Sequence, residues 1–132
     1  MKSRVLSNSD IEPLLSLLSD TFDVSTLGHS EIGLPIHGVK IGSGPKRILL
    51  WSQMHGNEST TTKALFDLFN YLKLEDFNAF LGTCTLFIIP ILNPDGAKAY
   101  TRLNANKVDL NRDAINRSQK ESIILISVFN EF

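Results

Sequence analysis

The sequence predicts an α/β fold, the N-terminal half of a mixed, largely parallel sheet flanked by helices. Two apolar runs, Ile48–Trp51 and Cys84–Leu92, are continuous rather than alternating, which is typical of strands buried on both faces. A helical spacing of apolar residues begins at Glu58, between these runs, and another begins at Ser118. Strand, helix, strand, loop and helix is the element order of an α/β domain, so we expect residues 1–132 to belong to a single domain.

The residues before the first buried run predict a helix and a hairpin. Ser9-Asp10 is a candidate cap for the helix. The apolar face of this helix is formed by residues at helical spacing, namely Ile11, Leu14, Leu15 and Leu18. From Val24 to Gly44, glycines and prolines divide the chain into short extended pieces, so we expect a hairpin around Gly33-Leu34-Pro35.

The middle of the chain predicts a helix that directly follows the first buried strand. We expect Glu58 to begin it, with an apolar face that consists of Ala64, Leu65, Leu68, Phe69 and Leu72. A loop through Asn78–Gly82 then leads to the second buried strand. Both strands run into polar motifs, at His55 and at Asn93, and ligands in open α/β sheets gather at the carboxyl ends of strands. We therefore expect the two motifs to lie on one rim.

The last third of the chain combines an irregular segment with one further helix. Asn93-Pro94-Asp95-Gly96 is a turn by composition, and a polar stretch continues to Arg112. Ser118, with Glu121 three residues later, matches a capping box. The apolar face of this last helix is expected to contain Ile124, Leu125, Val128, Phe129 and Phe132. The pattern stops at Phe132 without a capping residue, so we expect a truncated domain that lacks its C-terminal half.

Composition and charge exclude several classes of protein. The net charge of −1 argues against a nucleic-acid or anionic-membrane partner, which would favour clustered Lys and Arg. The longest apolar stretch, Leu86–Leu92, is too short to span a bilayer. A single cysteine, Cys84, excludes an internal disulfide, and the first ten residues contain no apolar signal segment. These observations predict a cytoplasmic protein.

The most informative motif is His55-Gly56-Asn57-Glu58, which stands where the first apolar run ends and the helical pattern begins. An imidazole and a carboxylate three residues apart on such a turn can both face one Zn²⁺, and hydrolytic zinc sites use two His and one Glu with water in the fourth position. Gly56 would permit the sharp turn that this requires. The alternative is a histidine at a strand end and a glutamate in the first helical turn, where the helix dipole favours an anion.

A second polar group lies on the irregular segment and consists of Arg102, Asn104, Asp109, Leu110, Asn111 and Arg112. Arginine meets a carboxylate in bidentate fashion and asparagine adds a neutral donor, so this segment is a candidate anion-binding surface. The alternative is a solvated loop whose arginines pair with surface carboxylates.

In this order and spacing, H-x-x-E, N-P-D-G and R-x-N-x-x-x-x-D-L-N-R resemble the zinc carboxypeptidases of the M14 type over about residues 48–112. The resemblance implies that His55 and Glu58 are the first two protein ligands of one Zn²⁺. It also implies that Arg102 is catalytic, polarising the scissile carbonyl, and that Asn111 and Arg112 bind the terminal carboxylate of the substrate. Residues 109–110 would hold their loop in shape, and residues 93–96 would support the rim.

The sequence departs from this family beyond residue 112. The family's third zinc ligand, its general-base glutamate and a substrate-contacting tyrosine have no counterpart here. His29 and His37 precede the motif and are interpreted as ordinary strand or turn residues. We therefore expect the chain by itself to be inactive, to bind zinc weakly and to self-associate through helix faces and a sheet edge that truncation exposes.

The motifs support three functional hypotheses. The first is a zinc metallocarboxypeptidase that hydrolyses the last bond of a peptide with zinc-activated water. The second keeps the zinc and changes the substrate, because deacylases of N-acyl amino acids and murein-peptide amidases share the H-G-N-E and D-L-N-R pieces. The third is a non-catalytic fragment that binds only carboxylates. In each case the expected ligand carries a free carboxylate, as a peptide or an N-acyl amino acid does.

Overall fold

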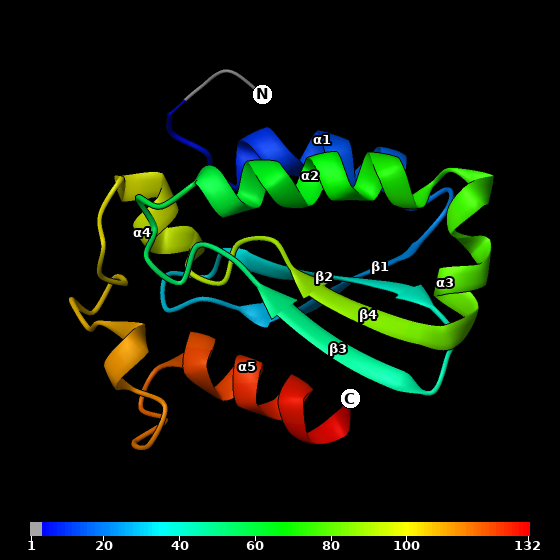
Figure 1. The fold of residues 1–132 in the computed structure, drawn as a ribbon. Helices are drawn as coiled ribbons and strands as arrows, with labels where there is room; N and C mark the ends of the chain where they lie inside the picture. The colour runs from blue at the N-terminus through cyan, green and yellow to red at the C-terminus, as the bar shows by residue number, and fades with distance from the viewer. Residues whose placement is uncertain (1–3) are drawn as a thin grey trace.

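The computed structural model describes residues 4–132, apart from the side chain of Glu75, and its centre is a mixed sheet of four strands in the order β1-β2-β4-β3 (Figure 1). β1 (Asp23–His29) pairs antiparallel with β2 (Pro35–Gly42), and β2 pairs antiparallel with β4 (Cys84–Ile89). β3 (Lys46–Trp51) pairs parallel with β4. The predicted mixed α/β sheet is confirmed, with its parallel pairing between the two strands that α2 connects.

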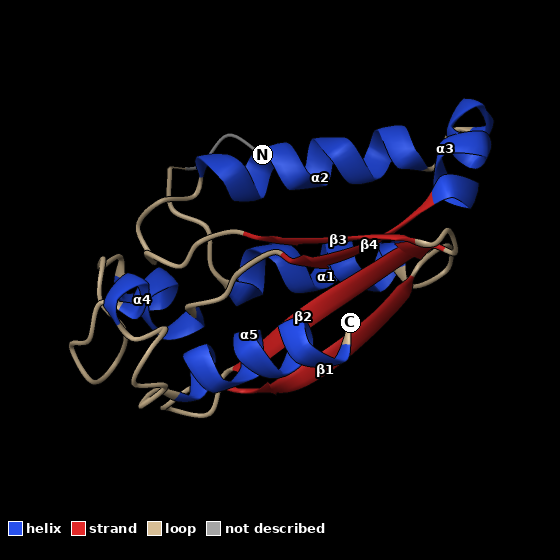
Figure 2. Ribbon diagram, turned by 60° about the horizontal axis from the view of Figure 1, so that its bottom comes forward, coloured by secondary structure: helices blue, strands red, loops and turns tan. Residues whose placement is uncertain are grey.

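Helices cover both faces of this sheet (Figure 1). α1 (Asn8–Leu18) and α2 (Thr60–Leu72) bury their apolar faces against one side, where Phe69, Val39 and Ile88 are fully buried. α5 (Lys120–Glu131) packs against the other side through Leu125 and Val128. Figure 2 shows α4 (Pro94–Ala99) and the loops around it at one end of the sheet and α3 (Asn78–Thr83) at the opposite end. No helix among residues 4–132 has the length and apolarity to cross a membrane.

The N-terminal helix and hairpin are confirmed, with one change at the cap. The N-cap of α1 is Ser7 rather than Ser9, because the Asp10 carboxylate accepts a hydrogen bond from the Ser7 N–H at 2.8 Å. The turn of the β1–β2 hairpin passes through Gly33, whose φ of 88° is one that side chains rarely adopt. Residues 30–34 are closed by a backbone bond from the Ser30 N–H to the Leu34 carbonyl.

The two apolar strands differ in burial, which the sequence did not indicate. β4 is central and buried, and it ends at Ile89 rather than Leu92. β3 lies at the edge of the sheet in the part of the chain that the structure describes, so the prediction of a buried strand is wrong: Ile48 is 38% exposed and Trp51 is 44% exposed. A continuous apolar run is compatible with either position, since only the strand order decides which strand has a neighbour on both sides.

Several helix boundaries also differ from the predictions. α2 begins at Thr60 rather than Glu58, and the expected loop at 78–82 forms α3, preceded by a 3₁₀ turn, η1 (Glu75–Phe77). The N-P-D-G motif opens α4, because the Asn93 side chain accepts a hydrogen bond from the Gly96 N–H and proline suits the first helical position. A second 3₁₀ turn, η2, covers Leu110–Arg112.

The capping box predicted for the last helix is wrong. Gln119 is the N-cap of α5, and the Asp113 carboxylate accepts hydrogen bonds from the N–H groups of Ser118 and Gln119, both at 3.0 Å. Glu121 is fully buried instead of reaching back to the cap. The apolar face is confirmed at Leu125 and Val128, whereas Phe129 is 67% exposed.

Candidate metal and substrate site

The turn that carries His55 and Glu58 connects β3 to α2 and is pressed against the backbone of α4. A bond from the Glu58 N–H to the His55 carbonyl, 3.0 Å long, closes the turn. A Cβ atom on Gly56 would lie 1.9 Å from the backbone carbon of Gly96, so only glycine fits at this position. Gly56 therefore fixes how closely the turn approaches α4, in addition to allowing it to bend.

Asn93 joins this turn to the end of β4. Its side-chain amide donates to the Met54 carbonyl at 3.2 Å, and its backbone N–H donates to the Gln53 carbonyl at 3.1 Å. Asn93 is fully buried, so these bonds are shielded from water. The expectation that N-P-D-G supports the rim is confirmed, and so is the expectation that the two motifs share one rim.

The His55 imidazole lies between two carboxylates. Its Nδ1 is 3.3 Å from Glu58 Oε1, and its Nε2 is 3.0 Å from Asp109 Oδ1. An ionised carboxylate only accepts hydrogen bonds, so the bond to Asp109 places the proton of a neutral imidazole on Nε2. That tautomer leaves the Nδ1 lone pair facing an oxygen of Glu58.

This donor pair fits two positions of a zinc site. The 3.3 Å between Nδ1 and Oε1 matches the ~3.3 Å that separates two ligands on a tetrahedral ion with bonds of about 2.0–2.1 Å. Asp109 supplies the outer carboxylate that commonly orients a metal-binding histidine. Among residues 4–132, however, no group of three or more His, Cys, Asp or Glu side chains is placed to hold a metal.

Arg102 completes a network of four charged or ionisable side chains. Its Nε donates to Asp109 Oδ2 at 3.2 Å, and its Nη1 lies 3.6 Å from Glu58 Oε1. Burial acts to raise the pKa of Asp109, but hydrogen bonds from His55, from the Asn111 N–H and from Arg102 outweigh it and lower that pKa below its ordinary value. Asp109 therefore remains an anion that links the histidine to the arginine.

The two predicted carboxylate-binding residues lie on η2 beside this network. The Asn111 N–H donates to Asp109 Oδ1 at 3.0 Å, and Arg112 Nη1 donates to the Asn111 carbonyl at 3.1 Å. Both residues are exposed. The structure thus brings all five predicted site residues to one rim, where Asp109 forms hydrogen bonds with every one of them except Glu58.

Asp109 is the site residue whose contact the sequence reasoning missed. It was expected only to hold its loop in shape, yet it binds His55, which lies 54 positions earlier in the chain. Nothing local in the sequence indicates this pairing. Asn104 was grouped with the anion-binding residues, but it is 5% exposed and donates to Gln119 Oε1 and Glu121 Oε2. It therefore anchors the loop to α5 and does not face a ligand.

Comparisons with known proteins identify the family and the fold of the chain. The zinc carboxypeptidase family matches residues 8–123. Carboxypeptidase SOL1 of Arabidopsis thaliana is 30% identical over 123 residues, which cover 82% of this chain and 25% of that protein. A metallo-carboxypeptidase from Pseudomonas aeruginosa is 25% identical with a TM-score of 0.83, over 96% of this chain and 36% of that one.

A metallo-carboxypeptidase from Burkholderia cenocepacia shares the fold, with a TM-score of 0.88 at 19% identity over 97% of this chain and 39% of that one. The chain thus spans between a quarter and about two fifths of the length of these relatives.

Proposed function

Because the chain belongs to the zinc carboxypeptidase family, we propose that it carries part of the active site of a zinc-dependent hydrolase that removes C-terminal residues from peptides. The observation that carries this proposal is the pairing of His55 Nδ1 with Glu58 Oε1, while Asp109 holds the other imidazole nitrogen. A bound zinc ion would lower the pKa of a water molecule and polarise the carbonyl of the substrate.

The chain's own residues would bind and orient the substrate. Arg102, half-exposed beside Glu58, would donate hydrogen bonds to the oxyanion that develops at the carbonyl, an interaction commonly worth a few kcal/mol. Asn111 and Arg112 would grip the terminal carboxylate, which confines hydrolysis to the last bond and aligns that bond with the metal. Both roles require side chains that are open to solvent before the substrate binds, as these are.

We further propose that residues 1–132 by themselves bind zinc weakly and do not hydrolyse peptides, because two protein ligands are fewer than the three of a catalytic zinc site. A peptide with a free C-terminus remains the proposed ligand, and a cytoplasmic setting remains a proposal. The exposed edge strand β3, with Ile48 and Trp51, supports the proposal of self-association.

Titration calorimetry with Zn²⁺ tests the metal proposal. We expect weak binding that His55→Ala abolishes and that His37→Ala, a change in a histidine paired with Glu12 away from the site, leaves unchanged. Binding that His55→Ala does not alter would overturn the assignment of His55, whereas tight stoichiometric binding that His55→Ala abolishes would overturn the claim that the ligand set is incomplete. Assaying the complete gene product on peptides with free C-termini against N-acyl amino acids separates the peptidase from the deacylase alternative.

A further inference from the structure

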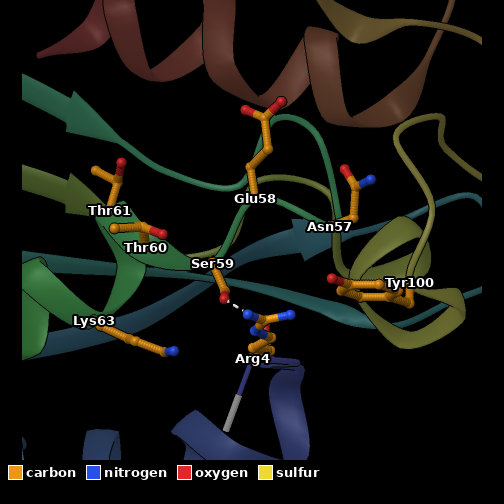
Figure 3. A pocket seen from close by; sticks show the side chains of 8 residues that line it. All are labelled: Arg4, Asn57, Glu58, Ser59, Thr60, Thr61, Lys63 and Tyr100. Atoms are coloured by element: carbon orange, nitrogen blue, oxygen red, sulfur yellow. Dashed lines mark hydrogen bonds between the residues drawn. The ribbon is translucent and has the colours of Figure 1, made fainter. Parts of the chain in front are cut away.

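A cavity of about 520 Å³ lies beside Glu58, on the side of the turn where α2 begins (Figure 3). It is lined by the turn, by the first residues of α2, by Tyr100 at the end of α4, and by Arg4 from the segment before α1. The lining brings together parts of the chain that are distant in sequence. No residue of this cavity other than Glu58 has a part in the function proposed above.

The cavity carries two cationic side chains without matching anions. Arg4 and Lys63 both line it, and neither forms an ion pair with any residue of the described part of the chain. Glu58 is the acidic residue of the lining, but its carboxylate is engaged with His55 and Arg102. Figure 3 shows the Glu58 carboxylate pointing away from Arg4 and Lys63. An anion in the cavity would therefore meet two cations whose charges are not already compensated.

Buried hydrogen bonds hold the segment that carries Arg4 in place. The Ser59 hydroxyl donates to the Arg4 carbonyl at 2.7 Å, and the Gln53 side-chain amide donates to the Leu6 carbonyl at 2.9 Å. Ser59 is 6% exposed and Gln53 is 3% exposed, so both bonds are largely shielded from water. The backbone of residues 4–6 is thus fixed against the turn that carries His55 and Glu58.

The remaining lining favours an anion as well. Thr60, Thr61 and Asn57, which are polar and uncharged, also line the cavity. No acidic residue occupies the first turn of α2, and the Ser59 side chain does not cap that helix. The positive end of the helix dipole therefore adds to the charges of Arg4 and Lys63.

The cavity and the residues proposed to bind the terminal carboxylate lie on different sides of His55. Asn111 and Arg112 lie on the Asp109 side of His55, whereas the cavity lies on the side of Glu58 and α2. In Figure 1 the turn of residues 55–58 lies between η2 and the start of α2. The turn that carries the metal ligands thus separates the cavity from the residues proposed to bind the terminal carboxylate.

We propose that this cavity binds the carboxylate side chain of an acidic residue on the amino side of the hydrolysed bond, so that acidic peptides are the preferred ligands. This inference rests on the proposed carboxypeptidase function for the direction of the peptide. The binding contribution comes from two partly exposed charge pairs, so the preference is moderate and weakens as ionic strength rises.

The test is an NMR titration of the 132-residue chain with two acetylated pentapeptides that differ only by Glu or Gln at the residues preceding the last. We expect the Glu peptide to bind about three- to tenfold more tightly at low salt, and to shift the amide signals of residues 57–63. Lys63→Gln and Arg4→Gln should each reduce that preference. Lys73→Gln, at the other end of α2, is the matched control and should retain it.

Amidated versions of both peptides separate this inference from the proposed function. Equal affinity for the Glu and Gln peptides, or no saturable shift with either, overturns the acidic preference. If amidation weakens binding while Glu and Gln peptides remain equal, the cavity proposal fails and carboxylate binding at Asn111 and Arg112 stands. If Glu is preferred and amidation leaves the affinity of both peptides unchanged, the cavity proposal stands and carboxylate binding at Asn111 and Arg112 fails.

Discussion

The turn that carries His55 and the loop that carries Arg102 to Arg112 reach the same rim but are held in different ways. The turn is fixed by close backbone packing of Gly56 on α4 and by the amide of Asn93. The loop is fixed by carboxylates, with Asp113 binding the start of α5 and Glu121 receiving a hydrogen bond from Asn104. The stability of the turn therefore depends on the volume of its side chains. The stability of the loop depends on the charge of its carboxylates and consequently on pH.

The largest effect is expected from adding a methyl group to the turn. Gly56→Ala would place a Cβ 1.9 Å from the backbone of Gly96, and the backbone cannot yield as a flexible side chain can. We expect a loss of about 3 kcal/mol or more in the free energy of unfolding, measured by urea denaturation. Gly82→Ala is the matched control, because a Cβ there would meet nothing within 4 Å, and it should be neutral or slightly stabilising. Equal effects of the two changes would contradict the packing argument.

A smaller, pH-dependent effect is expected from Asp113→Asn in the loop. Burial acts to raise the pKa of Asp113, but hydrogen bonds from Ser118 and Gln119 outweigh it and lower the pKa to about 2. Because this pKa lies below that of the unfolded chain, the carboxylate stabilises the fold above about pH 3.8, and the contribution is lost as pH falls through about 2.

At neutral pH, Asp113→Asn should cost about 1–3 kcal/mol in the free energy of unfolding, and the gap between variant and parent should close toward pH 2. Denaturant unfolding followed by circular dichroism over this pH range measures the gap. Asp67→Asn, an exposed change on α2, serves as the control. A gap that stays constant with pH would show that the hydrogen bonds to the ionised form are not the cause.

The smallest effect is expected from Glu121→Gln, and its sign is opposite. Burial raises the pKa of Glu121, whose Oε1 has no hydrogen-bond partner in the described structure, and nearby Asp95 and Glu31 raise it further. The folded chain therefore holds this proton at pH values where the unfolded chain releases it, so stability decreases as pH rises above about 4.5.

Replacing Glu121 by the neutral isostere removes this dependence. We expect Glu121→Gln to be more stable than the parent by about 1 kcal/mol near neutral pH and similar to it below pH 4.5. Thermal unfolding at several pH values checks both parts. A variant that is less stable at neutral pH would indicate that the ionised carboxylate stabilises the loop.

The sequence by itself determined the local features of this protein. The apolar spacing of α1, α2 and α5 and the hairpin around Gly33 depend on neighbouring residues, so they can be read from short windows. The His55–Glu58 motif is local in the same sense, because the two residues are only three positions apart on one turn and their side chains meet there. The family resemblance also identified the motifs at Asn93 and at residues 102–112 as parts of the site, since their order and spacing are visible in the sequence.

Only the tertiary structure decided the features that join distant segments. Whether β3 lies at an edge depends on the strand order, and the contact of Asp109 with His55 spans 54 positions. The burial of Glu121 and the meeting of Arg4 with Lys63 at one cavity likewise depend on how the elements pack. Side-chain spacing specifies which face of an element is apolar, whereas hydrogen bonds and charges between segments form only after the faces have packed together.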